Sequence, residues 1–324
     1  MKCERREPDL SFSLDVKREM CRIEADSACC RKSELAGILR AGLTLKKSPD
    51  GFRLLFSTEN APLSRRVFVL AKEFYGFDPG VSGRRTRRFR NRSVYQLDFS
   101  SLIEGGQDLL GDIGLSVSPD SGELMYMNYR VRKRCCRRAF LRGGFLAAGS
   151  ISDPDKSYHL EVAFRSRLQA EEYIQYLQAF GLQARSIRRK GHYLAYLKEG
   201  QEIVDFLNVT GAHKALMNLE NIRIMKEMRN QVNRLVNCET ANLGKTVDAS
   251  LRQIESIRFI QDHAGLDSLP DTLREIAALR LENPDVSLAE LGRMLEPPLS
   301  KSGVNHRLRK IERIAQSMGF SPGQ

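Results

Sequence analysis

Residues 29–43 read CCRKSELAGILRAGL, and residues 135–149 read CCRRAFLRGGFLAAG. The two stretches match at a constant offset of 106 positions. The identical residues are the cysteine pair, the arginine after it, Leu35 and Leu141, Gly37 and Gly143, and Ala41 and Ala147. An ordered series of matches marks an internal repeat, and this period is far too long for a solenoid. The sequence therefore predicts two related domains in a pseudo-twofold pair.

Each copy continues with the same succession of expected elements, separated by turn signals. In the first copy we expect a helix over 31–42, strands over 43–47 and 52–57, a helix over 62–75, strands over 81–90 and 92–99, and a helix over 107–113. In the second copy we expect a helix over 137–148, strands over 149–152 and 157–164, a helix over 167–180, strands over 183–189 and 192–197, and a helix over 201–208. The order αββαββα therefore occurs twice, which predicts an α+β fold.

The rest of the chain is expected to be helical. A helix from 212 to about 236 is followed by the run NCETAN at 237–242 and by a second helix from 246 to about 263. The predicted domains are a helical lead-in at 1–30, repeats at 31–115 and 116–211, a helical connector at 212–267 and an all-α domain at 268–324.

The composition is that of a soluble globular protein with a polyanionic partner. Of the 324 residues 41% are hydrophobic, and no apolar run approaches the roughly 18 residues of a membrane helix. The first residues are charged and lack the apolar core of a signal peptide, so we expect a cytoplasmic protein. A net charge of +12 favours a polyanion but does not by itself separate DNA, RNA and anionic lipid.

The seven cysteines, an odd number, fit the reduced thiols of a cytosol. Two adjacent pairs, Cys29-Cys30 and Cys135-Cys136, raise the question of a metal site. Neighbouring residues point apart, and zinc ligands are usually spaced as C-x₂₋₄-C. Small buried thiols at a helix start are the favoured interpretation, so we expect no metal and no cofactor.

Basic residues gather at equivalent points of the two repeats. The second hairpin of the first copy carries Arg84, Arg85, Arg87, Arg88, Arg90 and Arg92. The corresponding place in the second copy carries Arg185, Arg188, Arg189 and Lys190. Matched clusters in a duplicated domain predict one basic surface that contacts DNA phosphates, which positions a protein without reading sequence.

A helix-turn-helix is predicted between about 286 and 313. Ser287 and Glu290 have the spacing of a capping box before a short helix, and Ser300 is a good N-cap for a longer one. In the longer helix an apolar stripe faces away from a basic side. The residues expected to contact DNA are Ser287, Ser300, Lys301, Ser302, Asn305, His306, Arg309, Lys310 and Arg313. An ordinary three-helix bundle with a solvated basic face is the alternative.

The helices that lead the repeats resemble the signature helices of the LAGLIDADG homing endonucleases. The matching runs are LAGILRAGL at 35–43 and LRGGFLAAG at 141–149, and the element order is also that family's. In those enzymes an acidic residue near each helix end supports the divalent metals that activate water. The equivalent positions here are Gly42 and Ala148, which cannot bind a metal, while Asp153 and Asp155 lie in a turn beyond the helix. The resemblance therefore implies a LAGLIDADG-like pseudo-dimer that is not an enzyme.

The whole chain resembles the WhiA family of sporulation regulators, which join a degenerate LAGLIDADG region to a C-terminal helix-turn-helix. The runs that carry this resemblance are RGGFLAAGSISDP at 142–154, NRLVNCETAN at 233–242 and VSLAELG at 286–292. It implies a nucleoid-associated transcriptional regulator that binds double-stranded DNA and is tied to sporulation, cell division and chromosome segregation. One alternative is a non-specific nucleoid protein, or a scaffold that acts through a sigma factor or RNA polymerase. The other is a metal-dependent endonuclease, which the loss of both acids disfavours.

Overall fold

The computed structural model of the protein describes residues 11–25, 27–49, 51–86, 92–103, 109–118 and 123–321, with the backbone alone for 84–86 and 92. By its internal contacts the chain divides into a first unit, Met1–Lys226, and a second unit, Glu227–Gln324. In the described residues no helix is both long and apolar enough to cross a bilayer.

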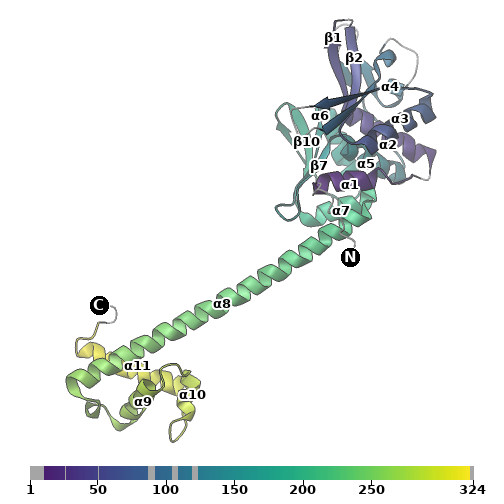
Figure 1. Cartoon of the computed structure of the whole chain (residues 1–324). Helices are drawn as coiled ribbons and strands as arrows, with labels where there is room; N and C mark the ends of the chain where they lie inside the picture. Colours follow the sequence, from purple (N-terminus) through teal and green to yellow (C-terminus); the bar gives the residue numbers. More distant parts are fainter. Residues whose placement is uncertain are drawn as a thin grey trace, which may run out of the picture. The chain divides into compact units, whose positions relative to one another are not determined.

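The first unit contains the two repeats in the predicted order (Figure 1). After α1 (Phe12–Met20), the first repeat runs α2 (Ala28–Gly42), β1 (Leu43–Ser48), β2 (Gly51–Thr58), α3 (Ala61–Tyr75), β3 (Gly80–Thr86), β4 (Arg92–Asp98), η1 (Ser100–Leu102) and α4 (Leu109–Asp112). The second runs α5 (Arg134–Ala148), β7 (Gly149–Ile151), β8 (Leu160–Phe164), α6 (Arg167–Gln178), β9 (Arg185–Arg189), β10 (His192–Leu197) and α7 (Gly200–Thr210). The duplicated α+β fold expected from the sequence is confirmed.

Each repeat forms a four-stranded antiparallel sheet, ordered β1-β2-β4-β3 in one and β7-β8-β10-β9 in the other. Successive side chains of a strand point to opposite faces of its sheet. In β2 and β8 the alternate residues Leu54, Phe56, Leu160 and Val162 belong to the core that the helices cover. We call the opposite side of each sheet its outer face.

The leading helices α2 and α5 pack against each other at the centre of the unit (Figure 1). Gly37 and Gly143, the equivalent glycines of the two repeats, allow this close approach. A Cβ atom on Gly37 would lie 2.3 Å from the carbonyl oxygen of Phe140, and one on Gly143 would lie 2.2 Å from that of Glu34. Neither distance is possible for real atoms, so the two backbones touch where only glycine fits.

Buried ion pairs tie this helix pair to its surroundings. Glu34 of α2 is fully buried and accepts hydrogen bonds from Arg142 Nε of α5, at 2.9 Å, and from Arg66 of α3. Arg40, also buried on α2, donates through Nη2 to Glu172 Oε2 of α6 at 2.6 Å. A buried charge is tolerated only when it is paired, so these contacts determine how the four helices assemble.

The second unit is all-helical. It contains the end of α8 (His213–Ala264), then η2 (Leu266–Ser268), α9 (Asp271–Glu282), α10 (Leu288–Arg293) and α11 (Lys301–Ser317). Its core includes Ile257 and Ile260 of α8, which lie in the stretch expected to be connector. The buried Arg280 of α9 donates to Gln253 Oε1 of α8 at 3.2 Å and to the carbonyl oxygen of Val286 at 2.6 Å. The end of α8 is therefore part of this module.

Two features differ from the sequence-based expectation. The predicted interruption at 237–242 is wrong, because α8 continues through this run as one helix. The run contains no proline, and asparagine and threonine weaken a helix only slightly. A short hairpin, β5 (Leu115–Val117) with β6 (Leu124–Tyr126), follows the first repeat and was not predicted. Strands of this length carry too few residues for an alternating pattern.

Candidate nucleic-acid interface

The long helix α11 presents a polar face opposite its buried stripe. Val304, Leu308, Ile311 and Ala315 are buried in the core of the second unit, as the sequence pattern predicts. The residues exposed on the rest of the helix include Lys301, Ser302, His306, Arg309, Lys310 and Arg313, while Asn305 is half-buried. Contact of these side chains with DNA stays a prediction.

Local sequence determines how α10 and α11 begin. The Ser287 hydroxyl accepts a hydrogen bond from the Glu290 amide at 3.3 Å, and the Glu290 carboxylate accepts one from the Ser287 amide at 3.1 Å. Hydrogen bonding of the Glu290 carboxylate to the Ser287 side chain and backbone amide lowers the pKa of that carboxyl. Ser300 caps α11 by accepting from the Gly303 amide at 3.2 Å. The capping predicted for both serines is confirmed, so their hydroxyl oxygens already have a structural role.

The turn between α10 and α11 depends on one glycine that the sequence analysis did not single out. A Cβ atom on Gly292 would lie 2.2 Å from the carbonyl oxygen of Leu299. Arg307, another residue not predicted to matter, is half-buried and donates through Nη1 to the carbonyl oxygen of Thr272 in α9 at 3.2 Å. Arg307 thus holds α11 against α9, whereas Arg309 and Lys310 extend into solvent.

The register of β9 separates the arginines of the second basic cluster. Arg185 pairs with Tyr196 and Arg189 with His192, on the same side as Glu161 of β8, which is the outer face. Arg188 pairs with Tyr193 on the helix-covered side, and its guanidinium lies 5.6 Å from the centre of the Tyr193 ring. The register therefore places Arg188 on the opposite side of the sheet from Arg185 and Arg189, and contact of these side chains with DNA stays a prediction. Lys190 is exposed at the turn between β9 and β10, directly before Gly191, and has a positive φ of 48°.

The first basic cluster is described only in part. The pairing places Arg84 opposite Val94, Arg85 opposite Ser93, and Arg92 opposite Thr86 in the hairpin of β3 and β4. Arg87, Arg88 and Arg90 lie outside the described residues. Arg84 of β3 and Arg189 of β9 occupy corresponding backbone positions in the two sheets. Each lies on the edge strand, where β3 pairs with β4 and β9 pairs with β10.

Other cations on the outer faces were missed by the sequence analysis. Lys46 of β1 and Arg53 of β2 pair directly and are exposed on the side opposite the core residue Leu54. Arg53 also forms an ion pair with Asp98. Arg165 donates to Thr44 Oγ1 at 3.2 Å and so links the two repeats. The period of two in these strands could have shown which residues share a face.

The ends of the leading helices do not fit a nuclease metal centre. A Cβ atom on Gly42 would lie 2.3 Å from Cε2 of Phe56, so a carboxylate side chain there would require the buried Phe56 ring to move. Asp153 forms an ion pair with Lys156 and accepts from the Asp155 amide at 3.0 Å, inside the turn after β7. Within the described residues, Cys29, Cys30 and Cys136 form the single group of three potential metal ligands.

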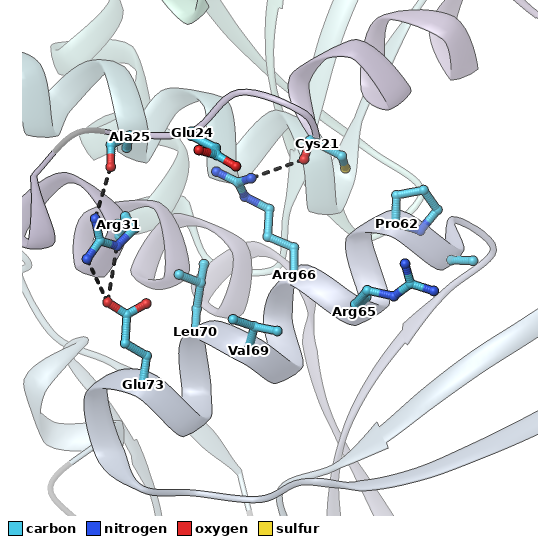
Figure 2. A pocket seen from close by; sticks show the side chains of 11 residues that line it. Cys21, Glu24, Ala25, Arg31, Pro62, Arg65, Arg66, Val69, Leu70 and Glu73 are labelled. Atoms are coloured by element: carbon cyan, nitrogen blue, oxygen red, sulfur yellow. Dashed lines mark hydrogen bonds and ion pairs between the residues drawn. The ribbon is translucent and has the colours of Figure 1, made fainter.

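A hollow of about 740 Å³ lies on the helix side of the first repeat, beside α3 (Figure 2). Its arginines hold the segment between α1 and α2 in place. Arg31 donates to the carbonyl oxygen of Ala25 at 3.1 Å, and Arg66 donates to the carbonyl oxygen of Cys21 at 3.0 Å. Burial raises the pKa of the Cys21 thiol to about 12, which keeps it protonated. This hollow is part of the scaffold and lies away from the outer faces.

Two α+β repeats joined through their leading helices, followed by a module with a short helix, a tight turn and a basic helix, define a duplicated LAGLIDADG-like protein with a C-terminal helix-turn-helix. Three family models match the chain: the WhiA N-terminal LAGLIDADG-like domain over residues 28–116, the WhiA LAGLIDADG-like domain over 137–229, and the WhiA C-terminal HTH domain over 232–315. The chain belongs to the WhiA family.

Similar proteins agree with this assignment over nearly the full length. The chain is 46% identical to the "Probable cell division protein WhiA" of Heliobacterium modesticaldum, covering 97% of this chain and 98% of that protein. It is 47% identical to the protein of the same description from Ruminiclostridium cellulolyticum, covering 95% and 97%. The crystal structure of full-length WhiA from Thermatoga maritima has a TM-score of 0.55 and 27% identity, covering 96% of this chain and 100% of that one.

Proposed function

We propose that the protein is a sequence-specific DNA-binding transcriptional regulator of cell division and chromosome segregation, and of sporulation in hosts that form spores. The observation that carries this proposal is the exposed cationic face of α11, which lies opposite a buried stripe and follows a capped helix and a tight turn. A helix presented in this way suits the major groove. The description of the relatives as probable cell division proteins supports the cellular process.

The outer faces of the two sheets are proposed to supply the phosphate contacts. Arg185 and Arg189 share the outer face of the second sheet, and Lys46 is exposed on that of the first. Contacts to phosphates add affinity on every sequence, while contacts to base edges discriminate between sequences. The protein would thus act on the nucleoid in the cytoplasm, with the sheets holding DNA and α11 reading it.

We infer that this protein does not cut the DNA it binds. Gly42 and Ala148 stand where the metal-supporting acids of homing endonucleases would be, and a side chain at Gly42 would displace the buried Phe56 ring. Plasmid and promoter DNA incubated with the protein and Mg²⁺ or Mn²⁺ should remain intact. Cleavage that is abolished by Asp153→Ala would contradict this inference.

Replacing Arg309 by alanine should reduce sequence preference more than overall affinity. Arginine to a guanine edge is the commonest specific contact, and removing a good bidentate pair costs about 1–3 kcal/mol of discrimination. Since Arg309 is exposed and clear of the buried stripe, the fold should be unchanged. Competition titrations with a cognate and a scrambled duplex measure the ratio of the two affinities.

Arg274→Ala is the matched control, because it removes one arginine from the same unit. Arg274 forms ion pairs with Asp267 and Asp271, at 3.1 Å and 2.5 Å, which occupy its guanidinium. It should therefore leave the specificity ratio as it is in the parent protein. If Arg309→Ala and His306→Ala also leave that ratio unchanged, the C-terminal module is not the reader.

Replacing Arg185 and Arg189 together by alanine should weaken binding on all sequences alike. The slope of log K against log salt should fall by about 0.9 for each DNA phosphate that the variant no longer neutralises. Arg188→Ala removes a charge from the same strand but from the helix-covered side, so it should leave the slope unchanged. Equal effects of Arg188→Ala and the double variant would show that the outer face does not bind DNA.

A non-specific nucleoid protein, or a scaffold for a sigma factor or RNA polymerase, is the second candidate function. The basic residues on the outer faces suit it, because they carry no sequence information. A genome-wide occupancy map separates the two functions. Discrete peaks at promoters support a sequence reader, and an even distribution along the chromosome supports the second candidate.

A further inference from the structure

Cysteines from the two repeats meet where α2 and α5 begin. Cys30 and Cys136 hold equivalent positions, both are buried, and their Sγ atoms lie 3.9 Å apart. The Sγ atom of Cys29 lies within 4.8 Å of both. Zinc–sulfur bonds of about 2.3 Å at the tetrahedral angle place two sulfur ligands about 3.8 Å apart. The spacing of Cys30 and Cys136 is therefore close to that of two ligands on one ion.

A fourth sulfur is available on the solvent side. Cys135 is the equivalent of Cys29 in the second repeat and directly precedes Cys136 in α5; it is not among the three sulfurs that lie within 4.8 Å of one another. Cys30 and Cys135 also line one hollow of about 330 Å³. Because Cys135 is exposed, this hollow gives an ion a path from solvent to the buried sulfurs. We call these residues the four-cysteine cluster: Cys29, Cys30, Cys135 and Cys136.

Positive charge gathers around the four cysteines, while burial raises the pKa of the Cys30 and Cys136 thiols. All four cysteines lie in the first turns of α2 and α5, where helix dipoles present positive charge. Arg31 and Lys32 follow the first pair, Lys133 and Arg134 precede the second, and Arg138 lines the hollow. Nearby cations and helix N-termini stabilise thiolates, and a Zn²⁺ ion with four thiolate ligands carries excess negative charge that these groups would offset.

We propose that the four-cysteine cluster binds one zinc ion, which joins the start of α2 to the start of α5. Soft thiolate ligands select zinc among the common divalent metals, and a site with four protein ligands is structural. The ion would crosslink the two repeats through residues 106 positions apart in the sequence. Binding to the folded state alone would stabilise the central helix pair that joins the two repeats.

The zinc content of the full-length chain tests the proposal directly. The protein is purified under reducing conditions without chelators, and elemental analysis by mass spectrometry should find close to one zinc per chain. Reconstitution with Co²⁺ after chelation should produce the near-ultraviolet charge-transfer band of cobalt–thiolate bonds, with the visible bands of a tetrahedral site. A reduced chain that takes up neither metal would overturn the proposal.

Variants show whether the bound metal belongs to this cluster. Cys29 and Cys135 are not buried, so replacing either by serine should preserve the fold and lower zinc affinity by more than the about 10–100-fold that loss of an outer-shell partner costs. Cys238→Ser, on the exposed middle of α8, is the matched control and should keep the metal. Chelation should lower the Tm of the parent protein and of the control alike.

Three results count against the zinc site. The zinc content of Cys238→Ser could fall as far as that of the cluster variants, which would place the metal elsewhere. The Tm could be unaffected by a chelator that removes the metal. Mass spectrometry of the untreated chain could show a disulfide between Cys30 and Cys136. The two cysteines would then lie close together because they form a redox pair, not because they bind zinc.

Discussion

Replacing Glu34 by alanine is expected to destabilise the protein by about 3–5 kcal/mol, because it leaves the buried Arg142 without its carboxylate partner. Arg142 donates to Glu34 through Nε at 2.9 Å and also through Nη2, and Arg66 donates to the other carboxylate oxygen. One carboxylate thus neutralises two guanidinium groups from two different helices. A destabilisation of this size is a large part of a typical domain's 5–15 kcal/mol.

The effect should appear as a lower Tm and a lower denaturant midpoint for the first unit. Glu171→Ala is the control, because Glu171 is an exposed glutamate that pairs with Arg167 one turn away at 2.6 Å. Such surface pairs contribute about 0.2–0.5 kcal/mol. Glu34→Gln keeps the side-chain volume but removes the negative charge, so it should still destabilise the protein more than Glu171→Ala does. A Glu34→Ala variant as stable as Glu171→Ala would show that Arg142 finds another partner.

Replacing Gly143 by alanine should also destabilise strongly, although alanine is the better helix former. The new Cβ atom would stand 2.2 Å from the carbonyl oxygen of Glu34, and backbone cannot move aside as a side chain can. The helices α2 and α5 must then separate along their interface. Overpacking usually costs about 1–3 kcal/mol, and occasionally more. Gly37→Ala should behave in the same way, since its Cβ would meet the carbonyl oxygen of Phe140 at 2.3 Å.

Gly244→Ala provides a control in which the same substitution has the opposite sign. Gly244 lies inside α8, and a Cβ atom there would have nothing within 4 Å. It should therefore stabilise the helix by about 0.5–1 kcal/mol, the intrinsic difference between the two residues. Thermal unfolding of the three variants, followed by circular dichroism, compares them. Equal stability of Gly143→Ala and the parent protein would contradict the close packing of α2 on α5.

Much of the fold could be predicted because local patterns record it. The duplication is visible at residues 29–43 and 135–149, and the order of elements that follows each copy is the one in the structure. The stripe from Val304 to Ala315 and the two serine caps depend on residues within a few positions of each other, and all are confirmed. Such patterns can be recognised in a single sequence, because a helix face and a helix cap are formed by residues that are close together along the chain.

Register and long-range packing decided the rest. That Arg185 and Arg189 share an outer face, while Arg188 does not, depends on which side of β9 the helices cover. The residues of α8 contain no stop signal strong enough to end a helix, so the interruption predicted at 237–242 was wrong.

By itself, the sequence determined that the chain is a duplicated α+β protein with a basic helical module at its end. Repeat, periodicity and charge are properties of the linear chain, and they need no partner in space. Only the tertiary structure placed Glu34 against Arg142 and brought Cys30 to Cys136, since each pair joins residues more than a hundred positions apart. The close approach of α2 and α5 makes both contacts, and it is set by two glycines whose backbones touch.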